Sequence, residues 1–193
     1  MVKILAFAGS ARDGSYNKRL VRVAAQGARK AGAEVTYIDL RDLPMPLYDE
    51  DLQAKEGFPA NVREFKDLMR AHQGLLIACP EYNSSITPLL KNAIDWASRP
   101  EGDEPMLACF RDKVAAIMSA SPGGLGGMRG LVHVRDILGN IGVLVIPDQK
   151  AISKASEAFN DDGSLKDAKQ QEAVENLGAK VATILAKLYS NSI

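Results

Sequence analysis

Five short runs with the hydrophobic pattern of β-strands recur along the chain, and segments with helical spacing separate them. Four of the runs are nearly continuous in aliphatic residues, which is typical of parallel strands covered on both faces. We therefore predict five strands, at residues 3–8, 34–39, 74–79, 113–119 and 143–147.

The segments between the runs carry apolar residues at intervals of three and four, which predicts helices at residues 17–31, 61–71, 87–97 and 129–140. A last helix, at about residues 165–189, has an apolar stripe that we expect to face the core: Ala173, Leu177, Val181, Ile184 and Leu188. Strands that alternate with helices indicate a doubly wound α/β sandwich. No linker, repeat or low-complexity tract divides residues 1–193, so we expect a single domain with longer loops at residues 41–60, 99–112 and 150–164.

In such a sheet, ligands bind beyond the carboxyl ends of the strands. The loop after the first strand contains Gly9, Ser10, Arg12, Gly14, Ser15 and Asn17. Its glycines permit a tight turn, and the N-terminus of the next helix makes it an anion site for which phosphate is the natural guest. A strand-to-helix turn with Ser15 as N-cap and Arg12 in solvent is the alternative.

The kind of phosphate follows from what this loop lacks. It does not end in Gly-Lys-Ser/Thr, and its glycines do not fit the dinucleotide fingerprint G-x-G-x-x-G. A loop rich in hydroxyl groups and without lysine suits a monoester phosphate that needs no metal. The terminal phosphate of FMN is such a group.

The loop after the third strand forms a polar tip with one aromatic residue, Tyr82, between Glu81 and Asn83. Pro80 ends the strand, and Thr87 with Pro88 predicts the start of the next helix. A planar heterocycle needs a ring to pack against and polar groups at its edge, as this tip would supply. The alternative is a surface loop in which the tyrosine is incidental.

The loop after the fourth strand has four glycines between Gly123 and Gly127. They permit close backbone approach to a ligand, or alternatively only a flexible turn. Gly124-x-Gly126 is followed by Arg129 where a dinucleotide fingerprint has glycine. Each of the three loops is ambiguous by itself, but together they converge on one crevice.

Charge and composition exclude several classes of function. Lys+Arg and Asp+Glu both total 24, so the net charge is zero, which argues against binding to nucleic acid or to a membrane surface. The apolar runs are too short to span a membrane, and the first leads directly into Arg12 and Asp13, as in a strand of a cytoplasmic protein. Cys79 and Cys109 would permit one disulfide, but buried free thiols in a reducing compartment are favoured.

The chain has no cluster of His and Cys that would predict a metal site. His72 and His133 are interpreted as packing or surface residues, and no side chain is assigned as a catalytic acid or base.

Three motifs, GSxRxxSxN (Gly9–Asn17), PEYN (Pro80–Asn83) with KNAIDW (Lys91–Trp96), and SPGGxGG (Ser121–Gly127), resemble those of the NAD(P)H-dependent FMN reductases. This flavodoxin-like family includes quinone, chromate and azo-dye reductases, and the resemblance spans Met1 to about Pro147. It implies a three-layer sandwich with helices on both faces of a five-stranded parallel sheet, in the order 2-1-3-4-5.

The resemblance also implies non-covalent FMN, with a role for each loop. The phosphate would be held by Ser10, Arg12, Ser15 and Asn17. One side of the isoalloxazine ring would be lined by Pro80, Glu81, Tyr82, Asn83 and Ser84. Its pyrimidine edge would face Ser121, Pro122, Gly123 and Gly124.

The activity so implied is an oxidoreductase in which hydride passes from NAD(P)H to FMN and electrons pass to a quinone, free flavin or similar small acceptor, in a ping-pong cycle. A flavodoxin-type electron carrier that does not oxidise NAD(P)H is the alternative, although such carriers are usually strongly acidic and this chain is neutral. A receiver-type signalling domain would need acidic residues at the end of the first strand, where this chain has Gly9 and Ser10.

The resemblance further implies a homodimer or homotetramer with the flavin near the interface. The predicted helix at residues 87–98 supports this interpretation, because its apolar residues spread over more than one face. We expect Trp96 or its neighbours to be exposed in a monomer and buried by a second chain. The alternative is that the loop at residues 99–112 folds back to cover them.

Overall fold

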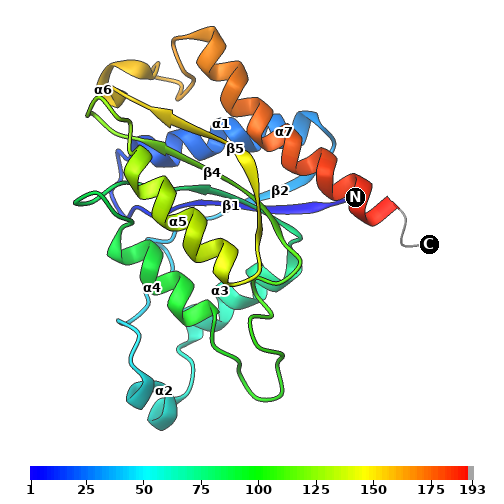
Figure 1. Cartoon of the computed structure of the whole chain (residues 1–193). Coiled ribbons are helices and arrows are strands. Elements are labelled where there is room, and N and C mark those ends of the chain that lie inside the picture. The colour runs from blue at the N-terminus through cyan, green and yellow to red at the C-terminus, as the bar shows by residue number, and fades with distance from the viewer. Residues whose placement is uncertain (191–193) are drawn as a thin grey trace.

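A computed structural model describes residues 1–190 of the chain. Its five strands form one parallel sheet in the order β2-β1-β3-β4-β5 (Figure 1). The strands are β1 (Lys3–Ala8), β2 (Glu34–Tyr37), β3 (Gly74–Ala78), β4 (Val114–Ala120) and β5 (Leu144–Ile152). The five predicted strands and the strand order are therefore confirmed.

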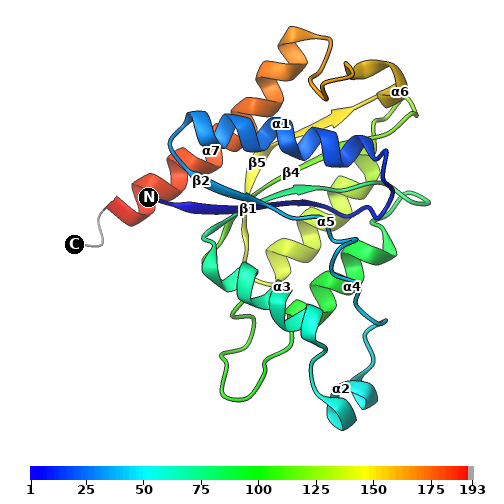
Figure 2. The same cartoon turned by 180° about the vertical axis from the view of Figure 1, so that it is seen from behind.

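Helices cover both faces of this sheet, as Figures 1 and 2 show. The helices are α1 (Tyr16–Lys30), α2 (Glu50–Glu56), α3 (Ala60–Ala71), α4 (Pro88–Ala97), α5 (Met128–Asn140), α6 (Ala155–Ala158) and α7 (Ala168–Ser190). α1 and α7 lie on one face, and α3, α4 and α5 lie on the other. The flavodoxin-like three-layer sandwich is confirmed, while α2 and α6 lie in segments that we predicted as loops.

The central strands are the buried ones. β3 and β4 are buried along their whole length, and β1 is buried from Ile4 to Ala8. Each face of these strands packs against one layer of helices, which explains their continuous aliphatic sequences. None of the helices within residues 1–190 combines the length and the apolarity that crossing a membrane requires.

β5 continues past Pro147, where we predicted its end. Its register with β4 shifts after Val145, and regular pairing resumes at Gln149. The Arg135 guanidinium reaches this irregularity and donates hydrogen bonds to the Ile146 carbonyl (2.9 Å) and to the Gln149 side chain (2.9 Å). Because β5 is an edge strand with a bulge, a proline costs little there. A proline is therefore a poor marker of this strand's end.

α1 and α7 cross in close contact on one face of the sheet, and two glycines make the approach possible. A Cβ atom at Gly27 of α1 would overlap the backbone carbonyl of Glu175 in α7. A Cβ atom at Gly178 of α7 would likewise overlap the carbonyl of Ala24 in α1. The backbones of the two helices thus touch where neither residue has a side chain.

This crossing also corrects the predicted core stripe of α7. The buried residues are Val174, Leu177, Gly178, Val181, Ala182 and Leu185. Leu188, which we placed in the stripe, is 54% exposed, and Ile184 is only partly buried. The buried face of α7 is therefore rotated from the predicted one. Gly178 lies at its centre against α1, and a prediction from hydrophobic residues alone does not place a glycine in the core.

Replacing either glycine of the crossing by alanine should force α1 and α7 apart. We expect Gly27→Ala and Gly178→Ala each to lower the free energy of unfolding by at least about 1–3 kcal/mol, as overpacking does. Gly139→Ala in α5 is the matched control, because a Cβ atom there meets nothing within 4 Å. The control should gain up to about 1 kcal/mol of helix propensity. Urea unfolding measures all three, and equal effects would contradict this account of the crossing.

Candidate functional site

A pocket of about 240 Å³ opens at the carboxyl ends of β1, β3 and β4. It is lined by Ser10, Arg12, Ser15, Tyr16, Asn17, Pro80, Glu81, Tyr82, Ala120, Ser121 and Pro122. Nine of these belong to the residues that we predicted from the three loops. Asn83, Ser84, Gly123 and Gly124 are not among the lining residues, and Tyr16 and Ala120 are two that sequence reasoning missed.

The first loop passes directly over α4, and this contact explains Gly9. A Cβ atom at Gly9 would lie 2.8 Å from the Leu90 Cβ atom, so close packing against α4 requires glycine. The Thr87 hydroxyl donates a hydrogen bond to the Gly9 carbonyl (2.7 Å) and accepts one from the Leu90 amide (3.2 Å). Thr87 therefore caps α4, as predicted, and also holds the first loop.

The N-terminus of α1 faces this pocket, and no negatively charged side chain in its first turn would repel an anion. Ser15 occupies the N-cap position, and within the described residues its side chain makes no capping hydrogen bond. The first turn of α1 contains no acidic residue. The amide groups and the positive end of the helix dipole thus remain able to bind an anion.

Arg12 stands at the rim with its guanidinium held on two sides. It donates a hydrogen bond to the Gly14 carbonyl (2.9 Å) and lies 5.0 Å from the centroid of the Tyr16 ring. Tyr16 in turn stacks on Phe159, with centroids 6.0 Å apart. Arg12 forms no ion pair with any residue in the described range 1–190. Its charge is therefore available to a ligand.

The polar tip after β3 is a tight hairpin. The backbones of Tyr82 and Ser85 exchange two hydrogen bonds of 3.0 Å. Asn83 and Ser84 between them have φ of 50° and 66°, as the central residues of a type I′ turn require. These two residues make the turn and lie outside the pocket lining, whereas Tyr82 lines the pocket and is 56% exposed.

Glu81 ties this hairpin to the start of α5. Its carboxylate accepts hydrogen bonds from the Gly130 amide (3.0 Å) and from the Arg129 guanidinium (3.2 Å). A Cβ atom at Gly130 would come within 3.2 Å of the Ser85 carbonyl oxygen, so α5 and the hairpin are packed closely. The Glu81 side chain is thus occupied by protein groups.

The glycine-rich loop after β4 has two parts with different roles. Gly126 and Gly127 have φ of 64° and 90°, and Cβ atoms there would press on the Ile152–Ser153 backbone and on Ser119. The Ser119 hydroxyl also donates to the Gly126 carbonyl (2.6 Å). These glycines serve packing and turn geometry. Gly124 has open space around it, and so does Gly123 apart from the Ser121 hydroxyl at 3.7 Å.

Trp96 is fully buried, so our prediction that α4 leaves it exposed is wrong. The indole is covered by the loop before α2 together with Phe58. In the loop at residues 99–112, Cys109 and Phe110 belong to the buried cluster that contains Ile94 and Ala97 of α4. The indole N–H donates to the Pro46 carbonyl (2.8 Å), and the Tyr48 and Phe58 rings pack edge-on against the indole ring. The chain therefore satisfies this face of α4 without a second subunit.

Neither the two cysteines nor the two histidines line the pocket. Cys79 and Cys109 are free and buried, as predicted, and burial raises the pKa of the Cys79 thiol, which keeps it protonated. His72 is buried between the Leu68 carbonyl and the Thr36 hydroxyl, and exposed His133 contacts Ser85. The described residues contain no group of three or more His, Cys, Asp or Glu that could hold a metal ion.

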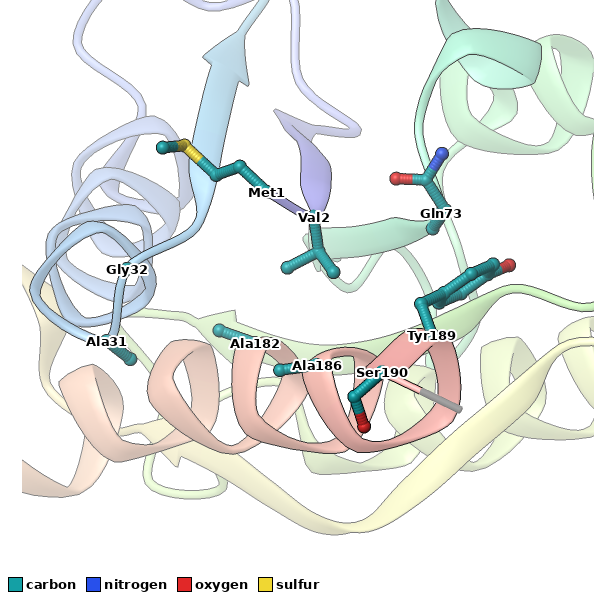
Figure 3. Close-up of a pocket in the computed structure, with 9 residues that line it drawn as sticks. All are labelled: Met1, Val2, Ala31, Gly32, Gln73, Ala182, Ala186, Tyr189 and Ser190. Atoms are coloured by element: carbon teal, nitrogen blue, oxygen red, sulfur yellow. The ribbon is translucent and has the colours of Figure 1, made fainter. Parts of the chain in front are cut away.

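A larger pocket, of about 410 Å³, lies at the opposite edge of the sheet (Figure 3). It is formed by Met1 and Val2 before β1, by the end of α7, and by the segments that precede β2 and β3. None of the described residues that line it has a charged side chain. Of these two pockets, only the smaller one at the carboxyl edge is lined by a cationic side chain, that of Arg12.

The sequence of the chain is similar to those of known oxidoreductases. A family model described as NADPH-dependent FMN reductase matches residues 2–157. An NAD(P)H-dependent FMN reductase from Pseudomonas aeruginosa is 40% identical over 175 residues, which cover 90% of each chain. A probable NADPH:quinone oxidoreductase from Oryza sativa subsp. japonica is 36% identical, over 91% of this chain and 85% of that protein.

Among solved structures, the fold is similar to that of FerB, a flavoenzyme NAD(P)H:(acceptor) oxidoreductase from Paracoccus denitrificans. The TM-score is 0.81 at 28% identity, and the alignment covers 97% of this chain and 98% of FerB.

Proposed function

The chain belongs to the NADPH-dependent FMN reductase family, a family of oxidoreductases, and from this premise we propose that it binds FMN at the carboxyl edge of the sheet. There it would transfer electrons from NAD(P)H to a quinone, free flavin or similar small acceptor. The observation that carries the proposal is the meeting of the α1 N-terminus, unpaired Arg12 and the exposed Tyr82 around one pocket.

The residues of this pocket fit FMN. Arg12, the hydroxyls of Ser10 and Ser15, and the first-turn amides of α1 would hold the phosphate without a metal. The open space at Gly123 and Gly124 would let the backbone approach a planar edge. At about 240 Å³ the pocket is below the typical range of about 300–1,000 Å³, so part of the cofactor would lie at the rim beside Tyr82.

When bound, FMN would supply the two-electron chemistry of the reaction. The chain's own residues bind and orient it: the first loop at the phosphate, the hairpin Pro80–Ser85 at one side, and Ser121–Gly124 at the polar edge. The hydrogen bonds of Glu81 fix the hairpin against α5. No side chain of the pocket is assigned a proton-transfer role.

We further propose a ping-pong cycle, a single domain and a cytoplasmic location. One open rim would receive NAD(P)H and the acceptor in turn. A single sheet with its helices accounts for residues 3–190. The two buried free thiols suit a reducing compartment.

The purified protein should bind FMN and oxidise NAD(P)H with a simple quinone such as benzoquinone as acceptor. Flavin absorption bands, an FMN titration, and initial rates that give parallel double-reciprocal lines are the measurements. If FMN does not bind with better than about millimolar affinity, the proposal fails. FMN binding without NAD(P)H oxidation would instead favour the electron-carrier alternative.

Arg12→Ala should weaken FMN binding about ten- to a hundredfold, because a charge-assisted contact of roughly 1.5–3 kcal/mol is lost. Riboflavin, which lacks the phosphate, should bind the variant and the wild type equally. Arg129→Ala is the control, since Arg129 is paired with Glu81 and should not distinguish the two ligands. Equal losses of FMN and riboflavin in Arg12→Ala would indicate a structural role for Arg12.

We also propose a homodimer or homotetramer, now on different grounds from those of the sequence. Four apolar side chains beside the pocket are 50–56% exposed, namely those of Tyr82, Leu125, Met128 and Val132. They lie on the hairpin, the glycine-rich loop and the start of α5, which the Glu81 hydrogen bonds hold together. An apolar patch of this kind commonly marks an interface, and a second copy would cover it and complete the flavin cleft.

Val132→Lys should therefore shift the protein toward monomer in sedimentation at micromolar concentration, with weaker FMN binding. Leu188→Lys is the matched control, because Leu188 is 54% exposed but lies near the end of α7, at the opposite edge of the sheet. A wild-type monomer that keeps its flavin, or equal effects of the two variants, would contradict this interface.

A further inference from the structure

We propose that Asn17 is a positioning residue that couples the two ends of the candidate flavin site, and that it does not act as a ligand of the phosphate. The inference rests on the proposed function, because it concerns the same site. It differs from the role that family resemblance implied for Asn17.

The Asn17 side chain is hydrogen-bonded to the backbone of Ala120, and we call this pair of hydrogen bonds the clamp. Asn17 lies in the first turn of α1, and only 4% of it is exposed. Its Nδ2 donates a hydrogen bond to the Ala120 carbonyl (2.8 Å), and its Oδ1 accepts one from the Ala120 amide (3.0 Å). The two residues are 103 positions apart in sequence. The carboxamide oxygen and one of the two N–H groups are thus committed to a single backbone residue.

Ala120 needs this partner because its neighbouring strand has ended. The Met118 carbonyl accepts a hydrogen bond from the Cys79 amide, and two residues later the polar groups of Ala120 face the same side. The ladder between β3 and β4 stops at the pair Ala78 and Met118, so no β3 residue pairs with Ala120 on this side. A carboxamide has the same donor and acceptor as a peptide group. Asn17 therefore replaces the missing strand and satisfies buried groups that are costly to leave unpaired.

The clamp joins two parts of the pocket that would contact different ends of FMN. Asn17 follows Ser15 at the start of α1, beside the expected phosphate position. Ala120 immediately precedes the Ser121–Gly124 loop, beside the expected ring. Losing the clamp would therefore loosen the site for the whole cofactor, whereas losing a phosphate ligand would weaken the phosphate contact alone.

The decisive variant is Asn17→Ala, titrated with FMN and with riboflavin. We expect both affinities to fall by the same factor, on the order of tenfold or more. At saturating FMN, the visible spectrum of the bound flavin should differ from that of the wild type, and in Arg12→Ala it should not. Loss of FMN affinity with unchanged riboflavin affinity would make Asn17 a phosphate ligand and overturn the proposal. An unchanged spectrum would show that Asn17 does not affect the ring end of the site, and this too would overturn it.

Asn92→Ala is the matched control for a general loss of stability. The Asn92 carboxamide forms the same kind of pair away from the pocket, donating to the Pro46 carbonyl (2.9 Å) and accepting from the Tyr48 amide (2.8 Å). Asn92→Ala should lower the free energy of unfolding without changing either flavin affinity. An equal loss of flavin binding in Asn92→Ala would show that the Asn17 effect is not specific to the site.

A measurement on the wild-type protein without flavin keeps the proposal testable if Asn17→Ala does not fold. By NMR hydrogen exchange, the Ala120 amide should be protected in the flavin-free protein, and its protection should persist when FMN is added. Rapid exchange of this amide would overturn the clamp. Failure of the wild type to bind FMN would instead refute the proposed function. The exchange rate of the Ala120 amide would still show whether the hydrogen bonds between Asn17 and Ala120 form.

Discussion

Parallel strands that feed helices on opposite faces leave backbone N–H and C=O groups without ladder partners at the carboxyl edge of the sheet, and this protein satisfies them with side chains. The Thr87 hydroxyl donates a hydrogen bond to the Gly9 carbonyl, and the Ser119 hydroxyl donates one to the Gly126 carbonyl. The Asn17 side chain forms hydrogen bonds with both the amide and the carbonyl of Ala120. Thr87 and Asn17 join segments that are far apart in the sequence, and the Ser119 hydroxyl holds the glycine-rich loop against the end of β4. The shape of the pocket depends on this set of bonds, because its walls are the loops that they hold.

The charges at this edge are arranged so that one cation faces the pocket. Glu81 engages Arg129 and the α5 N-terminus, which removes a carboxylate and a guanidinium from the list of available ligands. Arg12 is held over Tyr16, which leaves its charge uncompensated by any carboxylate within residues 1–190. Together with the N-terminus of α1, this favours an anion bound without a metal, as the monoester phosphate of FMN would be.

Predictions from the sequence were correct where the local pattern of residues is enough to specify the structure. Nearly continuous aliphatic runs located the central strands β1, β3 and β4, since strands buried on both faces admit few polar residues. Prediction failed where a residue's role depended on a distant partner. Pro147 did not end β5, because the strand lies at an edge and Arg135 bonds its bulged carbonyls. Trp96 was expected to be exposed, but the loop around Pro46 covers it.

The fold class, the three converging loops and nine of the residues that line the pocket could be predicted from the sequence. They follow from local periodicity and from the rule that parallel strands end at one edge. Which polar atoms remain free for a ligand depends instead on the packing of distant segments. The tertiary structure committed Asn17 to Ala120 and Glu81 to α5, and it assigned Gly9, Gly126 and Gly127 to close packing. A donor or acceptor that already has a protein partner is not available to a ligand. For Asn17 that partner is 103 positions away in the sequence, and the spacing of residues along the chain does not predict it.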